Sequence, residues 1–159
     1  MIISNIDDKE DLILREEFYG RIIYPINIFF SIDTYKSIKT IKFMVVEEFS
    51  KVVLFKGWKE LEQRNESIFY EDLELYNMAI REVDEFLSKI VGIVNFTLYI
   101  NHKILFSFLY GQYNLKSNNP SLPLFNSFKE SLSYRNINCV FLKKSLLNKI
   151  TSRYTSTHI

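Results

Sequence analysis

The spacing of apolar residues changes abruptly at Gly92, and this change constrains the fold more than any other feature. Between Phe69 and Val91, apolar residues recur every three or four positions, as on one face of an amphipathic helix. From Ile93 to Tyr110 they alternate with other residues, which is typical of strands. A chain with both periods needs helices that pack on a sheet. The sequence therefore predicts an α+β fold.

The predicted sheet is small and antiparallel, and it packs against amphipathic helices. It consists of an edge strand, a central hairpin and a C-terminal strand. Pro25 cannot donate a hydrogen bond to a neighbouring strand, so the first strand should lie at an edge or carry a bulge. Asn101 and His102 lie between the two halves of the hairpin and are interpreted as its turn. The expected strands cover residues 21–31, 93–100, 104–110 and 136–142.

Helices are expected at residues 7–19, 69–91, 124–134 and 144–150. Residues 33–55 are also predicted to be helical, because their apolar residues recur at helical spacing and Asp33 is available as an N-cap. Two strands, at 41–46 and 52–55, are the competing interpretation, since β-branched residues are plentiful there. Residues 151–159 are polar and are expected to fray.

The length and composition are those of one globular domain covering residues 1–159. The single cysteine has no partner for a disulfide, and the acidic N-terminus lacks the basic and apolar segments of a secretory signal. These features indicate a cytoplasmic protein. The apolar region 90–110 is long enough to cross a membrane, but Asn101, His102 and Lys103 in its middle argue against a span.

The chain is poor in residues that carry out chemistry. It has two histidines, one cysteine and four glycines, and none of them forms a zinc-ligand pattern or a glycine-rich phosphate loop. We therefore expect no metal site, no cofactor and no catalytic residue. His102 is interpreted as a solvated turn residue and Cys139 as a buried, inert thiol. Paired carboxylates remain a route to acid–base chemistry, although no two acids are seen to converge.

Charge is distributed unevenly along the chain. Residues 57–90 contain nine acidic and four basic residues, whereas the chain from Lys103 onward contains eight basic residues and one acidic residue, Glu130. Helical spacing places four of the acids on one narrow arc with a methionine among them. This arc is interpreted as either a solvated helix face or a partner-binding surface. Its residues are Glu71, Glu74, Met78, Glu82 and Glu85.

A small chain that is rich in isoleucine, lysine, asparagine, phenylalanine and tyrosine and lacks catalytic motifs resembles the immunity proteins encoded beside bacterial toxins of contact-dependent and polymorphic secretion systems. The resemblance implies a non-catalytic protein that binds one cognate toxin domain, often a nuclease, by direct contact. The acidic helix face would then mimic phosphates toward the basic cleft of a nuclease.

The alternative is a nucleic-acid-associated accessory protein that uses the basic C-terminal segment. This segment combines Lys143, Lys144, Lys149 and Arg153 with nearby aromatic residues. A third possibility is an enzyme whose carboxylates and tyrosines meet in a cleft that the sequence does not reveal.

Overall fold

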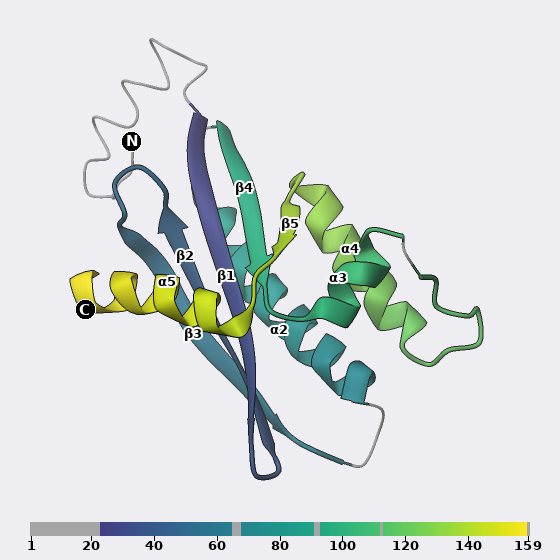
Figure 1. Cartoon of the computed structure of the whole chain (residues 1–159). Coiled ribbons are helices and arrows are strands. Elements are labelled where there is room, and N and C mark those ends of the chain that lie inside the picture. Colours follow the sequence, from purple (N-terminus) through teal and green to yellow (C-terminus); the bar gives the residue numbers. More distant parts are fainter. Residues whose placement is uncertain (1–22, 65–67, 91–92, 112, 159) are drawn as a thin grey trace.

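The computed structural model describes residues 23–64, 68–90, 93–111 and 113–158 (Figure 1). A five-stranded mixed sheet forms its centre, which confirms the α+β class. The strands are β1 (Ile23–Tyr35), β2 (Ile38–Glu47), β3 (Val53–Glu62), β4 (Ile93–Ile100) and β5 (Asn138–Phe141), arranged in the order β3-β2-β1-β4-β5. The helices are α2 (Ile68–Leu87), α3 (Lys103–Leu109), α4 (Leu122–Tyr134) and α5 (Lys144–His158).

The sheet joins an antiparallel part to a parallel part. Strands β1, β2 and β3 form an antiparallel meander, and β4 and β5 add to the other side of β1 in parallel. The strand that contains Pro25 is therefore central, and its predicted place at an edge is wrong. Pro25 precedes Ile26, the first residue of β1 that pairs with β2, so its missing N–H lies at the end of the β1–β2 ladder. The carbonyl oxygen of Pro25 accepts a hydrogen bond from the Glu48 amide at 2.9 Å.

The predicted hairpin at residues 93–110 is also wrong. Strand β4 ends at Ile100, and the second half of the expected hairpin is helix α3. His102 caps this helix, because its Nδ1 accepts a hydrogen bond from the Leu105 amide at 3.1 Å. Leu105 is the buried residue of α3, whereas Ile104 is 59% exposed. The alternation of apolar residues in this short segment therefore did not indicate a strand.

Residues 33–55 form strands rather than the expected helix. The competing interpretation of two strands is closer, although β1 already extends to Tyr35 and the later strands are longer than expected. Both faces of β2 are covered: Ile41 and Phe43 pack into the larger core, and Met44 and Val46 pack into the smaller one. Apolar residues on both faces of a strand obscure the period of two, which explains the helical appearance of the pattern.

Helices cover both faces of the sheet (Figure 1). One face packs against α2, with α4 beside it, and this larger core includes Ile28, Phe30 and Tyr76. Helix α5 crosses the opposite face and buries Leu147 against Phe29. The predictions for residues 69–91, 124–134 and 136–142 are confirmed by α2, α4 and β5.

Helix α5 is longer than predicted, because it includes residues 151–158, which the sequence suggested would fray. The helix expected at residues 7–19 lies outside the described residues. None of the helices in the described ranges combines the length and the apolar character that crossing a bilayer requires.

Candidate functional site

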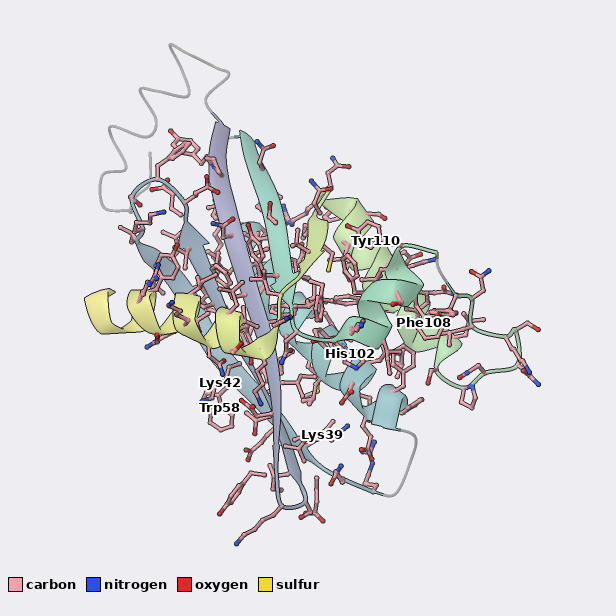
Figure 2. All side chains as sticks on the ribbon, in the orientation of Figure 1. Lys39, Lys42, Trp58, His102, Phe108 and Tyr110 are labelled. Carbon is pink, nitrogen blue, oxygen red and sulfur yellow. The ribbon has the colours of Figure 1, made fainter. Side chains whose placement is uncertain are left out.

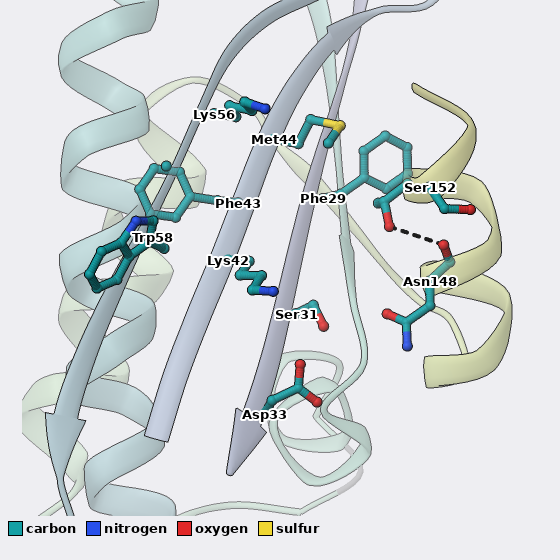
Figure 3. Close-up of a pocket in the computed structure, with 12 residues that line it drawn as sticks. Phe29, Ser31, Asp33, Lys42, Phe43, Met44, Lys56, Trp58, Asn148 and Ser152 are labelled. Atoms are coloured by element: carbon teal, nitrogen blue, oxygen red, sulfur yellow. Dashed lines mark hydrogen bonds between the residues drawn. The ribbon is translucent and has the colours of Figure 1, made fainter. Parts of the chain in front are cut away.

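A groove of about 820 Å³ lies where α5 crosses the sheet (Figure 3). It is built by the alternation of side chains along β1, β2 and β3, which sends every second residue toward α5. The strand register aligns these residues in rows: Ser31, Lys42 and Trp58 form one row, and Phe29, Met44 and Lys56 form the next. Residues far apart in the sequence are thereby brought together on one face.

The strand side of the groove combines an apolar floor with exposed cations. Phe29 and Met44 are buried, and the Phe29 ring stacks on Tyr99 with ring centroids 5.0 Å apart. Lys42 and Lys56 are exposed, and neither forms an ion pair with a residue of the described ranges. Two exposed lysines therefore lie beside a buried apolar floor.

Trp58 lies at the outer margin of the groove, on edge strand β3. It is the only tryptophan in the chain, and its side chain is 61% exposed. Figure 3 shows Lys42 on β2 between Trp58 and the β1 residues Ser31 and Asp33. An exposed indole beside a lysine offers a planar apolar surface next to a positive charge.

The opposite side of the groove comes from helix α5. Asn148, Thr151 and Ser152 line it with hydrogen-bonding groups. An ion pair between Lys144 and Asp33 holds the start of the helix against β1. Lys149 on the same helix is exposed. The basic C-terminal segment recognised in the sequence therefore lies beside the lysines of the sheet.

A second polar cluster is buried between β2, α2 and α3. The Lys39 ammonium lies 2.6 Å from an Asp72 oxygen and 3.8 Å from a Glu71 oxygen. The other Asp72 oxygen lies 2.8 Å from His102 Nε2. Because His102 Nδ1 already accepts a hydrogen bond, Nε2 carries the proton and donates it to Asp72. His102, expected to be a solvated turn residue, is instead half-buried, and its side chain belongs to this network. Figure 2 shows Lys39 and His102 at a different place from Lys42 and Trp58.

The charges of this cluster hold the Asp72 carboxyl in its ionised form. Burial alone raises the pKa of Asp72, but hydrogen bonds and charge interactions with His102 and Lys39 outweigh burial, so the pKa is lowered from its ordinary value of 3.8. The single Lys39 ammonium forms ion pairs with both carboxylates. Within the described ranges no group of three or more His, Cys, Asp or Glu side chains converges to hold a metal ion.

The acidic arc predicted to bind a partner is only partly exposed. Glu71 is 1% exposed, so its expected place on the solvent face is wrong. Glu74 is half-buried and paired with Arg64, and Glu82 is paired with Lys59 at 2.6 Å. Only Glu85 is exposed. Most of the acidic side chains of the arc are therefore buried or paired with basic side chains.

Three members of the arc do lie together at a shallow pocket. Met78, Glu82 and Glu85 line it together with Lys59 and Arg81. Met78 also packs against the larger core. Partner binding by Glu74, Met78, Glu82 and Glu85 stays a prediction.

Sequence reasoning missed the groove residues Lys42, Lys56 and Trp58. Their signal was present in the run from Lys56 to Lys59, where basic and apolar residues are mixed around Gly57. It was overlooked because residues 33–55 were interpreted as a helix, which separates Lys42 from Trp58. Only the strand register makes them direct neighbours.

No protein-family model matches the sequence, and no curated protein matches it. Solved structures do match. Ribonuclease H1 from the halophilic archaeon Halobacterium salinarum aligns with a TM-score of 0.61 at 11% identity, over 78% of this chain and 89% of that chain. LC11-RNase H1, solved in complex with an RNA/DNA hybrid, aligns with a TM-score of 0.62 at 16% identity over the same shares.

A third match is the N-terminal ribonuclease H domain of a Mycobacterium tuberculosis protein, with a TM-score of 0.59 at 13% identity over 78% of this chain and 91% of that chain. These neighbours contradict the interpretation of the chain as a toxin immunity protein, and they contradict the expectation that it is not an enzyme, because all of them are ribonucleases. The five-stranded sheet with its flanking helices is the fold of ribonuclease H.

Proposed function

We propose that this chain binds nucleic acid in the groove between α5 and the sheet. The observation that carries the proposal is the position of Lys42 and Lys56, two exposed ammonium groups without ion-pair partners in the described ranges, next to the exposed Trp58. Lysine and arginine side chains neutralise the phosphates in nucleic-acid complexes, and aromatic rings stack on bases. The fold adds support, since one neighbour was solved with an RNA/DNA hybrid.

Binding of this kind depends on the release of counterions from the phosphates. Each lysine that neutralises a phosphate contributes roughly 0.7 to 0.9 to the slope of log affinity against log salt. Lys42 and Lys56 are free to do so, whereas Lys144 is already paired with Asp33. The two sheet lysines should therefore dominate the salt dependence within the groove.

The experiment measures binding of a fluorescein-labelled RNA/DNA hybrid by anisotropy at several salt concentrations. Replacing both groove lysines by glutamate (K42E/K56E) should reduce the affinity at least tenfold and lower the salt slope by roughly 1 to 2. The matched control is K89E/K116E, which makes the same charge change at two exposed lysines that do not line the groove. Equal losses in both double variants, or no binding by the wild type at low salt, would contradict the proposal.

Cleavage of phosphodiester bonds is the second candidate activity, because the structural neighbours are ribonucleases. Many nucleases use pairs of metal ions held by carboxylates. The described residues do not fit such a site, because no group of three His, Cys, Asp or Glu side chains among them could hold a metal ion. The buried carboxylates Glu71 and Asp72 are already paired with the Lys39 ammonium. We therefore assign no catalytic step to a residue. Denaturing gels of the same hybrid, incubated with protein and magnesium or manganese, measure this activity directly.

A further inference from the structure

We infer that the groove takes an unpaired base onto the Trp58 ring, so that its preferred ligand contains a single-stranded segment. This inference rests on the proposed function and adds the class of nucleic acid. It follows from where Trp58 lies, what surrounds its ring, and which ligand can reach it.

Trp58 lies on the last strand of the sheet. The order β3-β2-β1-β4-β5 places no further strand of the described ranges beyond β3. The ring is 61% exposed and forms no aromatic pair with a described residue. One face of a large apolar ring is therefore available to a planar group that arrives from solvent.

Two lysines lie next to this ring, where they can contact the phosphates of a flexible single strand. Lys42 is the direct cross-strand neighbour of Trp58. Lys56 precedes Trp58 by two residues on the same face, roughly 6.8 Å away along the strand. A single-stranded nucleic acid with one base stacked on Trp58 would have the adjacent phosphates within reach of these ammonium groups.

The interior of a duplex cannot use the ring in this way. Its bases are stacked on one another, so an indole at the side of a duplex meets only sugar, phosphate and base edges. Stacking requires the face of a base, which each unpaired nucleotide offers and a duplex offers only at its two ends. Across the groove, Asn148 and Ser152 on α5 carry hydrogen-bonding groups that could meet the exposed edge of such a base.

The test compares three ligands: a single-stranded oligouridine of 12 nucleotides, a blunt 12-base-pair RNA/DNA hybrid, and the same hybrid with a six-nucleotide single-stranded extension. Trp58 is the only tryptophan, so quenching of intrinsic fluorescence reports directly on its ring. The single strand and the extended hybrid should quench this fluorescence and bind about tenfold more tightly than the blunt hybrid.

Variants then assign the preference to the ring, with affinity measured by anisotropy of labelled ligands. Trp58→Leu should lose about tenfold in affinity for the single strand and little for the blunt hybrid, while Trp58→Phe should keep most of the affinity. Tyr134→Leu is the control, because Tyr134 is 76% exposed on α4 and does not line the groove. Circular dichroism checks that each variant is folded.

The two proposals fail in different ways. If all three ligands bind equally well, or if Trp58→Leu leaves single-strand affinity unchanged, the inference about unpaired bases is overturned and groove binding stands. If none of the ligands binds at low salt, the proposed function itself is wrong.

Discussion

At the scale of single residues, the most consequential side chain is Lys39. Its ammonium group is almost fully buried beside two buried carboxylates. A buried charge is expensive unless its partner is present, and removing one member leaves the other unpaired. The network of Lys39, Glu71, Asp72 and His102 ties β2, α2 and the start of α3 together.

The first prediction compares this buried pair with an exposed one. Lys39→Met should lower the free energy of unfolding by about 3 to 5 kcal/mol, because two carboxylates lose their buried cation. Lys59→Met is the matched control: its ammonium also lies 2.6 Å from a carboxylate, Glu82, but both side chains are about a third exposed. The control should lose less than about 1 kcal/mol. Denaturant unfolding measures both variants, and equal losses would contradict the account.

The second prediction concerns pH and Asp72. Because the folded pKa is below the ordinary value of 3.8, the ionised carboxylate stabilises the folded state at pH values above 3.8. This contribution is lost as the pH falls from 3.8 through the folded pKa. The stability difference between wild type and Asp72→Asn should therefore be largest near pH 5 and shrink toward pH 2. A difference that stays constant over this range would contradict the role assigned to Asp72.

The third prediction uses two tyrosine hydroxyls. The Tyr76 hydroxyl is buried and has no hydrogen-bond partner within the described residues, whereas the Tyr110 hydroxyl donates to the Cys139 carbonyl at 2.5 Å. Tyr76→Phe should leave stability unchanged or raise it by about 1 kcal/mol, because it removes an unsatisfied polar atom. Tyr110→Phe should lower it by about 1 kcal/mol. The opposite order in thermal unfolding would contradict this assignment.

The fourth prediction follows from the Cys139 thiol, which the sequence indicated to be buried and which is 5% exposed. Burial raises the pKa of Cys139 to about 12. Little thiolate therefore exists at pH 8, and the thiol should react with a disulfide reagent only after unfolding. Rapid reaction in the native protein, followed by absorbance, would show that the strand around Cys139 opens easily.

At the scale of elements, the sequence predicted best where the apolar residues of an element recur with one clear period. Helix α2 was recognised because its apolar positions recur regularly and its other face is more polar. Strand β5 was recognised because Ile137 and Cys139 alternate with exposed residues. In β5 a single buried face leaves the period visible in the sequence, and in α2 the regular recurrence of apolar residues does so although Asp72 and Asn77 are buried too.

Elements with apolar residues on both faces were missed. Strand β2 buries Phe43 on one side and Met44 on the other, so its pattern has no clear period. Helix α3 is only seven residues long, too short for a helical period to be distinguished from alternation. The groove depends on both the register of β2 with β3 and the crossing of α5. These are tertiary features that residue spacing does not encode.

The fifth prediction belongs to strand β3. A Cβ atom added at Gly57 would lie 2.8 and 2.9 Å from two ring atoms of Phe43, whose ring is enclosed by Phe30 and Phe55. Gly57→Ala should therefore lower the free energy of unfolding by about 1 to 3 kcal/mol, although alanine normally suits a strand better than glycine.

A double-mutant cycle separates this clash from a general effect on the strand. Phe43→Leu replaces the ring by a smaller side chain, so adding Gly57→Ala to this variant should hardly change its stability. The expected coupling energy is about 1 kcal/mol or more. Simple additivity of the two changes in denaturant unfolding would mean that the close approach is unimportant.

At the scale of the whole molecule, the two faces of the sheet differ in character. One face is closed by α2 and α4 over the larger core. Among the described residues, the other face is crossed by α5, and beside this helix lies the groove with Lys42, Lys56 and Trp58. The basic C-terminal part of the sequence thereby reaches the open face, while the acidic helix α2 lies on the closed one.

The groove, rather than the acidic face of α2, is therefore the principal candidate for a binding surface. The acids of α2 are mostly paired or buried, whereas two groove lysines have no ion-pair partner among the described residues. Charges without partners are the ones that remain available to a polyanion.

The most direct test of the central claim is a nuclear magnetic resonance titration of the 15N-labelled protein with oligouridine at low salt. The indole N–H of Trp58 gives the one tryptophan side-chain signal, so its assignment is unambiguous. The account predicts that this signal and the amides of Lys42, Lys56 and Asn148 shift together, with signals of α2 unchanged. Shifts confined to the pocket around Met78 and Glu85, with the Trp58 signal unmoved, would contradict it.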